Sequence, residues 1–352
     1  MRLKKSHILV IAITILLLNV SSAIATPRFF TAKNTEETVK RNANPLPVSN
    51  AQDEASDLLD FDLVTEEAGW VLLGQNVYWS ADGGQRWENI TPGGMQPGGI
   101  RGVTFLDTLH GWMVAAHPNQ DGEFEYSLAR TFDRGLSWQV HRLNLFTPGN
   151  PDALAGAIYL QFLDENTGYL VVRRATSTPF RVGTLFKTAD GGLSWTRLAI
   201  PIGEAVYFTS ESTGWVAGGA SGEELYQTLD GGRSWNRRQV NTPLKPGEKR
   251  MYRLPVFESE DNGLLPVAIS DGETARVEYF ATTNRGNSWR LLESIPVGKG
   301  ISNGNDVPLS LINSREWMMV QPNSRRSIKS IQRAPQDRNR RNIQGIENLT
   351  AP

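Results

Sequence analysis

Short apolar stretches alternate with polar turns along most of this chain, and the alternation is periodic. In each unit an apolar stretch ends in Phe, and a Gly-aromatic pair follows after a polar turn, as at Phe105 and Gly111-Trp112. This pattern is typical of two short strands joined by a tight turn. The same spacing occurs at Phe162 with Tyr169, Phe208 with Trp215, and Phe257 with Leu264; Leu63 with Trp70 is a first version and Ser310 with Trp317 a degraded last one.

A second pattern, which we call the box, follows within the same units. It reads Ser/Thr-x-Asp-x-Gly-x-x-Trp and occurs five times, at Ser80–Trp87, Thr131–Trp138, Thr188–Trp195, Thr228–Trp235 and Thr282–Trp289. The third position is occupied by Asp82, Asp133, Asp190, Asp230 and, in the fifth copy, Asn284. The last position is occupied by Trp87, Trp138, Trp195, Trp235 and Trp289. Five copies at roughly even spacing indicate a repeat protein.

The chemistry of the box is that of a tight turn between two strands. An Asp side chain can accept hydrogen bonds from backbone N–H groups, which we expect to come from one and two residues further on. The Gly supplies a positive φ, the Ser or Thr offers one more local hydrogen bond, and the Trp opens the next strand with a large apolar ring. We therefore predict that the box residues are structural. Metal binding or catalysis is the less favoured interpretation, because a reaction centre is not normally copied five times.

Together the two patterns describe four short strands per unit, which is the blade of a β-propeller. The predicted fold is all-β, with a propeller over residues 58–321. Five blades are clear, a sixth is degenerate, and a seventh remains open. The five clear blades cover approximately residues 58–90, 102–145, 157–200, 204–240 and 252–295. Residues before Leu58 could close the ring, Ser327–Arg333 could do so less well, or the chain is truncated.

The two ends of the chain have a different composition from the repeats. Residues 1–25 combine a positive start, an apolar run over Ile8–Leu18 and a small-x-small site at Ala23–Ala25, which predicts a cleavable signal peptide. We expect an exported protein in a periplasm, a thylakoid lumen or the extracellular space, at most peripheral to a membrane. Residues 26–57 predict a flexible linker, and the basic residues 322–352 predict a disordered tail.

Composition narrows the chemistry further. The formal net charge is −1, which gives no reason to expect nucleic acid as a partner, and the chain has no Cys. The four His residues have no metal-ligand spacing, so we predict neither a metal site nor a cofactor. Asp57, Asp60 and Asp62 form a small acidic cluster, but it lacks the Gly and Glu of a calcium loop.

Two segments carry a family resemblance. Phe162–Tyr169 and Leu225–Trp235 resemble the repeat of the photosystem II stability/assembly factor-like family of Asp-box propellers, and the resemblance extends over about residues 58–321. It implies a non-catalytic, exported propeller that holds partner proteins while a membrane complex is assembled. A protein partner, such as a subunit of a membrane complex, is therefore expected.

Enzymes that share the box provide the alternative. Sialidases resemble one another in a Phe-Arg-Ile-Pro phrase before the first box, and the nearest match here, Phe180–Gly183, lies after the second box and lacks the Pro. Xyloglucan-active Asp-box enzymes resemble double propellers of about twice this length, so the length of the chain argues against this class. We favour a protein-binding scaffold, with a carbohydrate-binding or glycoside-hydrolysing propeller as the alternative. The candidate partner-binding residues are Arg173, Arg174 and Arg181 in the insertion of the third blade, where they could form a basic patch for an acidic partner segment. The alternative interpretation is that they are three solvated loop charges.

Overall fold

A computed structural model describes most of the repeat region. The described residues are 37–41, 58–65, 67–93, 99–118, 124–146, 155–174, 182–299, 309–313, 316–319 and 330–333. The expected signal peptide and Arg181 lie outside them, as do most residues of the expected linker and tail.

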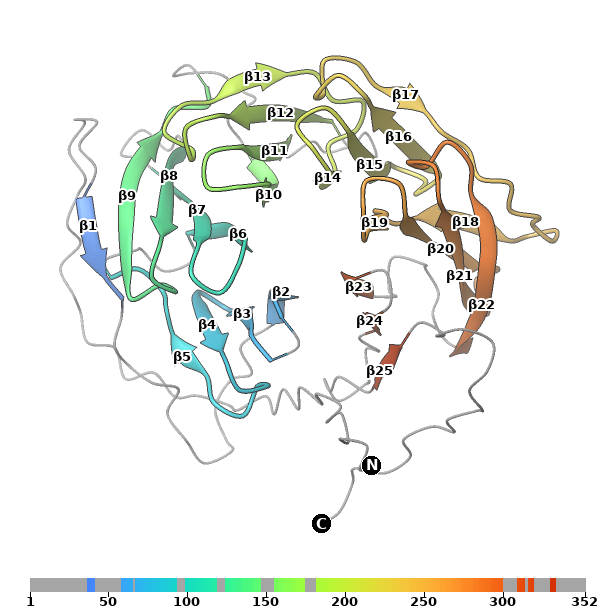
Figure 1. The fold of residues 1–352 in the computed structure, drawn as a ribbon, viewed down its shortest axis with the longest axis horizontal. Coiled ribbons are helices and arrows are strands. Elements are labelled where there is room, and N and C mark those ends of the chain that lie inside the picture. Colours follow the sequence, from blue (N-terminus) through green and yellow to red (C-terminus); the bar gives the residue numbers. More distant parts are fainter. Residues whose placement is uncertain are drawn as a thin grey trace, which may run out of the picture.

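Antiparallel sheets follow one another around a ring, and within each sheet the strands run from the centre outward (Figure 1). The all-β propeller is confirmed, with five blades of at least four strands. Blade 1 contains β2 (Leu58–Leu63), β3 (Gly69–Leu73), β4 (Asn76–Ser80) and β5 (Glu88–Asn89). Blade 2 contains β6 (Ile100–Phe105), β7 (Gly111–Pro118), β8 (Phe124–Thr131) and β9 (Ser137–Leu143).

The next three blades repeat the plan. Blade 3 contains β10 (Ala155–Phe162), β11 (Gly168–Arg174), β12 (Gly183–Thr188) and β13 (Thr196–Leu198). Blade 4 contains β14 (Val206–Phe208), β15 (Gly214–Gly218), β16 (Glu224–Thr228) and β17 (Asn236–Arg237). Blade 5 contains β18 (Lys249–Tyr252), β19 (Val256–Phe257), β20 (Gly263–Ser270), β21 (Thr274–Thr282) and β22 (Arg290–Lys299). Its innermost position is shared by β18 and β19, which both pair with β20.

A smaller sixth sheet lies between blades 5 and 1 (Figure 1). It contains β23 (Leu309–Asn313), β24 (Glu316–Met319) and β25 (Ser330–Arg333). Strand β23 is close to both β19 and β2, so this sheet occupies the gap in the ring. Strand β25 lies within the range expected as a disordered tail, and the structure places these four residues in the sixth sheet. This strand belongs to Ser327–Arg333, the segment that the sequence suggested as the poorer candidate for closing the ring.

The range expected as a linker also contributes a strand. β1 (Glu37–Lys40) pairs antiparallel with β9 and becomes a fifth, outermost strand of blade 2. The segment is held further by an ion pair of 2.6 Å between Arg41 and Glu88 of blade 1. Residues 37–41, within the range expected as a linker, are thus placed against blades 1 and 2. The sequence suggested that residues before Leu58 could form a strand that closes the ring. They do form a strand, β1, but it lies on the outside of blade 2 and not at the closure of the ring.

The second box shows how the turns are built. Thr131 Oγ1 donates to Asp133 Oδ1 at 2.8 Å and accepts from the backbone N–H of Gly135 at 2.8 Å. Gly135 has the predicted positive φ, 77°. Asp133 accepts from the backbone N–H of Ser137 at 2.9 Å and from its hydroxyl at 2.6 Å. The backbone donor to the carboxylate is thus four residues further on, not one or two, because the chain turns back before its N–H groups face the carboxylate.

An aromatic triad repeats between neighbouring blades. Trp112 of blade 2 stacks on Phe162 of blade 3, with centroids 3.8 Å apart and 7° between the ring planes, and the box residue Trp195 meets Phe162 edge-on at 6.2 Å. Such pairs add to the free energy gained by burying the rings. Equivalent triads are formed by Tyr169, Phe208 and Trp235, and by Trp215, Phe257 and Trp289.

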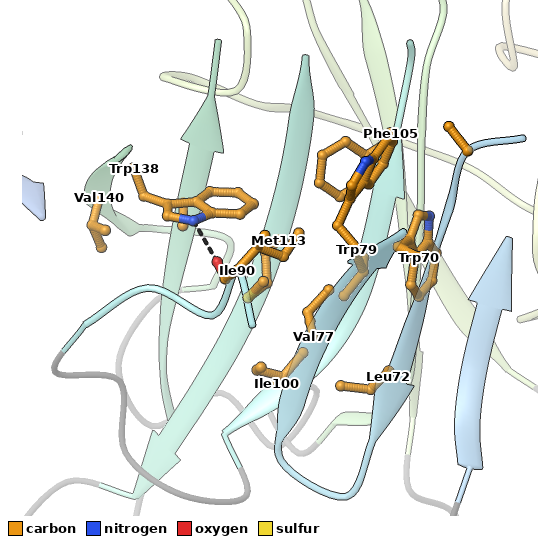
Figure 2. Packing of buried hydrophobic residues seen from close by; sticks show 13 residues of the cluster. Trp70, Leu72, Val77, Trp79, Ile90, Ile100, Phe105, Met113, Trp138 and Val140 are labelled. Carbon is orange, nitrogen blue, oxygen red and sulfur yellow. Dashed lines mark hydrogen bonds between the residues drawn. The ribbon is translucent and has the colours of Figure 1, made fainter. Parts of the chain in front are cut away.

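The junction of blades 1 and 2 departs from this plan (Figure 2). Here Phe105 contacts Trp79, with ring centroids 4.8 Å apart, while Trp70 of the Gly-aromatic pair is buried elsewhere in the same cluster. Trp138 again meets the Phe edge-on, at 6.3 Å, and its indole N–H donates to the carbonyl of Ile90 at 2.7 Å. Trp79 is the one Trp outside the two sequence patterns, and it takes the place of the stacked aromatic residue.

Candidate functional site

The carboxylates of the boxes are occupied by turn hydrogen bonds. Partial burial alone would raise the pKa of Asp133, but the hydrogen bonds from Ser137 and Thr131 outweigh it and hold the pKa below its usual range. The hydroxyl and backbone N–H of Ser234, with the hydroxyl of Thr228, lower the pKa of Asp230 to about 2. Carboxylates held ionised in this way are poor proton donors. Asp82, Asp190 and Asn284 make equivalent turn hydrogen bonds in the other boxes. The half-buried Trp87, Trp195, Trp235 and Trp289 each lie one residue before a strand, β5, β13, β17 and β22 respectively.

A cavity of about 440 Å³ lies inside the ring. Its walls come from blades 1, 3, 4 and 5, so the inner strands that repeat the same sequence pattern contribute different side chains to one space. The residues that line it are Asp62, Tyr159, Glu204, Ala205, Tyr207, Ala217, Gly218, Gly219, Gly222, Met251, Tyr252, Arg253, Leu254, Pro255, Val256 and Pro266. Most of this lining is apolar or aromatic with a few polar groups, which is typical of ligand-binding cavities.

An ion pair forms part of the wall between blades 3 and 4. Arg173, at the end of β11, donates to the carboxylate of Glu204 and to the hydroxyl of Tyr159, and its Nε donates to the carbonyl of Gly203 at 2.9 Å. Its guanidinium carbon also lies 5.4 Å from the centre of the Tyr159 ring. Glu204 retains only 7% of its surface exposed, so the ion pair is largely buried. The interpretation of Arg173 as a solvated loop charge is therefore wrong.

The three arginines of the predicted basic patch are not shown together. Arg174 follows Arg173 in β11, where side chains alternate between the two faces of the sheet. Its backbone N–H donates to the carbonyl of Val182 at 2.9 Å, and its side chain is half-buried. Arg181 lies outside the described residues. A patch formed by all three residues stays a prediction.

Blade 1 contributes the carboxyl group of Asp62 to the cavity lining, and Asp60 lies two residues before it. Asp60 and Asp62 share one face of β2, because side chains two positions apart in a strand point the same way. Burial raises the pKa of Asp62 to about 7, the backbone N–H of Leu63 opposes the rise, and the negative charge of Asp60 adds to it. Burial likewise raises the pKa of Asp60 to about 6, although this side chain keeps more of its surface exposed. A carboxyl group with a pKa near neutral pH therefore lines the cavity.

Sequence patterns did not identify most of these residues. Tyr159, Glu204 and Tyr207 belong to no repeated motif, and they meet only because blades 3 and 4 are adjacent in the ring. Asp60 and Asp62 were visible as a small acidic cluster, and their spacing of two was the available signal that they share a strand face.

Two kinds of feature are absent from the described residues. Nowhere in this part of the chain do three or more His, Asp or Glu side chains gather as metal ligands would. No helix among these residues is long and apolar enough to cross a membrane.

Comparisons with known proteins give structural neighbours only. No protein-family model matches the chain, and no curated protein matches it in sequence. A structure of YCF48 bound to D1 peptide has a TM-score of 0.43 and 15% sequence identity, over 85% of this chain and 96% of that one. The GH74 xyloglucanase from Xanthomonas campestris has a TM-score of 0.39 and 12% identity, over 82% of this chain and 52% of the enzyme. A PL25 ulvan lyase has a TM-score of 0.39 and 10% identity, over 66% and 68% of the two chains. These neighbours mix enzymes with a peptide-bound protein, and similarities this weak do not decide function.

Proposed function

We propose that this protein is a non-catalytic, exported propeller that binds a segment of a partner protein in the cavity inside the ring. The observation that carries the proposal is the lining of that cavity, in which tyrosines and apolar side chains from blades 3, 4 and 5 surround a few polar groups. Such a surface suits the side chains of an extended protein segment. The proposed partner is a subunit of a membrane complex whose assembly the propeller assists, in line with the sequence resemblance to assembly and stability factors.

Two features of the sequence extend this proposal. The predicted signal peptide would deliver the protein to a periplasm, a thylakoid lumen or the extracellular space, where it would be peripheral to the membrane. Arg174 and Arg181, which the sequence places in the insertion of the third blade, would attract acidic parts of the partner. Arg173 would act indirectly, by holding Tyr159 and Glu204 in the wall.

A glycoside-hydrolysing propeller is the second candidate, and one observation favours it. Asp62 and Glu204 line the same cavity, and burial raises the pKa of Asp62 to about 7 while Glu204 is paired with Arg173. Two carboxyl groups in one cavity, one of them with a raised pKa, are what acid–base cleavage of a glycosidic bond requires. In that case the purified protein would release reducing ends from a panel of polysaccharides, and both Asp62→Asn and Glu204→Gln would abolish the release.

A capture experiment tests the main proposal. The chain from residue 26 onward is immobilised and exposed to membrane extract, beside an Ala205→Trp variant that fills the cavity and a Leu229→Trp variant that adds the same ring on an exposed box turn. We expect a stoichiometric membrane-complex subunit to be retained by the wild type and by Leu229→Trp, but not by Ala205→Trp. Equal retention by all three proteins, or no retention together with polysaccharide cleavage, would contradict it.

A further inference from the structure

We propose that the cavity selects its partner by admitting one lysine or arginine side chain, whose cationic end is received by Asp62. This inference rests on the proposed function, since it names the chemistry of the segment that the cavity would bind. The occupant is therefore a basic residue within an extended stretch of a partner protein.

The lining of the cavity suits a long basic side chain. Lys and Arg combine an aliphatic stem with a charged end, so they fit a space that offers both apolar surface and a carboxylate. Met251, Leu254 and Val256 supply apolar surface for the stem, and Tyr207 supplies an aromatic ring that a cation can approach. At about 440 Å³, the cavity is large enough for one such side chain together with part of its backbone.

The charge of the cavity points in the same direction. Asp62 lines it from blade 1, and within the described part of the chain no cationic side chain is paired with this carboxylate, which accepts only the backbone N–H of Leu63, at 2.8 Å. Asp60 adds a second negative charge on the same face of β2. A cation placed beside Asp62 would offset the cost of keeping this carboxylate ionised away from water.

On the opposite wall, an arginine of the chain itself is already held between an aromatic ring and a carboxylate. The Arg173 guanidinium lies over the ring of Tyr159 and donates to the carboxylate of Glu204, and both of these residues line the cavity. Glu204 is thus already neutralised by a residue of the chain itself, and Arg253, the cation in the lining, is engaged within the protein. Asp62 is left as the carboxylate that a partner's cation can reach.

Peptide arrays test this inference directly. The array carries acetylated heptapeptides of mixed sequence with a fixed central Lys, Arg, norleucine or Glu, and the full mature chain is the probe. We expect at least tenfold more protein on the Lys and Arg sets than on the norleucine and Glu sets. Asp62→Asn should reduce the Lys and Arg signals to the norleucine level, while Glu67→Gln, which removes an exposed charge from the β2–β3 turn of the same blade, should leave them unchanged.

The outcomes separate this inference from the proposed function. Equal signals for Lys and norleucine, or a preference for Lys that survives Asp62→Asn, would overturn the inference. If Asp62→Asn also keeps its membrane subunit in the capture experiment while Ala205→Trp loses it, the cavity is a protein-binding site without selection for a cation. A circular dichroism spectrum and a urea unfolding curve for each variant establish that lost binding is not lost folding.

Discussion

The rings of Tyr169 in blade 3 and Phe208 in blade 4 stack with their centroids 3.5 Å apart and their planes 1° from parallel. The box residue Trp235 closes the arrangement edge-on, at 6.1 Å from Phe208. Because one ring belongs to each blade, this stack joins neighbouring sheets that share few backbone hydrogen bonds. The repeated aromatic residues therefore act mainly as links between blades.

Removing the central ring of this stack should be costly. Phe208 is 1% exposed, so Phe208→Ala leaves a cavity and exposes both neighbouring rings. We expect a loss of about 3–5 kcal/mol in the free energy of unfolding, measured by urea denaturation with tryptophan fluorescence. Phe132→Ala removes a ring that is 40% exposed, and it should cost less than about 1 kcal/mol. Similar losses for the two variants would show that the stack does not join the blades.

The box carboxylates should matter for stability and not for chemistry. Asp133→Ala removes the acceptor of three hydrogen bonds, from Thr131 and from the backbone and side chain of Ser137, and should cost about 1–2 kcal/mol. Asp133→Asn should cost less, because Asn284 makes the corresponding bonds in the fifth box. The measurement is again urea unfolding. An enzymatic activity that disappears in Asp133→Ala while the fold is retained would contradict a structural role.

Two boxes have an arginine where the others have a glycine with positive φ. Arg134 has φ of 63°, a conformation that an L-residue with a side chain resists. We expect Arg134→Gly to raise the free energy of unfolding by about 0.5–1 kcal/mol. Arg134→Ala is the control, since it loses the same side-chain hydrogen bond to the carbonyl of Thr108 without relieving the backbone. If Arg134→Gly is no more stable than Arg134→Ala, the turn is not strained.

The cavity carboxyl group should make stability depend on pH in an unusual direction. Burial raises the pKa of Asp62 from 3.8 to about 7, so between these values the folded protein binds more protons than the unfolded chain. This group therefore contributes stability below about pH 4 that is lost as the pH rises to 7. We expect Asp62→Asn to be more stable than the wild type at pH 8, with the difference shrinking toward pH 4, in urea unfolding at pH 4, 6 and 8.

A carboxylate with the opposite shift provides the matched control. Partial burial alone would raise the pKa of Asp164, but hydrogen bonds from the backbone N–H groups of Thr167 and Asn166 outweigh it and hold the pKa below its usual range. Asp164→Asn should therefore be less stable than the wild type at pH 8, and this difference should shrink as the pH falls. Parallel pH profiles for Asp62→Asn and the wild type would show that Asp62 is not desolvated in the folded protein.

The repeated features of the fold were predictable from sequence because each is local. The seven-residue spacing from Phe162 to Tyr169 and the order of residues in the box specify a strand, a turn and the next strand. The contact of Trp79 with Phe105 was not predictable, because a strand places its side chains on two faces and no motif indicates which face adjoins the next blade. The strand β1 was missed because Glu37–Lys40 has a polar sequence that pairs only with the edge offered by β9.

The cavity was not predictable, because it is formed by positions at which the repeats differ. Tyr159 and Tyr207 lie on equivalent inner strands and Glu204 precedes one of them, yet none belongs to the shared pattern. Their proximity depends on the order of the blades in the ring. The sequence singled out Arg173 as a candidate, but only the adjacency of blades 3 and 4 reveals Glu204 as its partner.

Photo-crosslinking tests most directly whether a partner protein enters the ring. The photoreactive residue p-benzoylphenylalanine replaces Tyr207, which lines the cavity, or Leu229, which is 53% exposed on a box turn, and each protein is irradiated in membrane extract. A single membrane-complex subunit crosslinked from position 207 and absent from position 229 is the predicted result. Crosslinking from position 229 alone, or the same set of products from both positions, would contradict a binding site inside the ring.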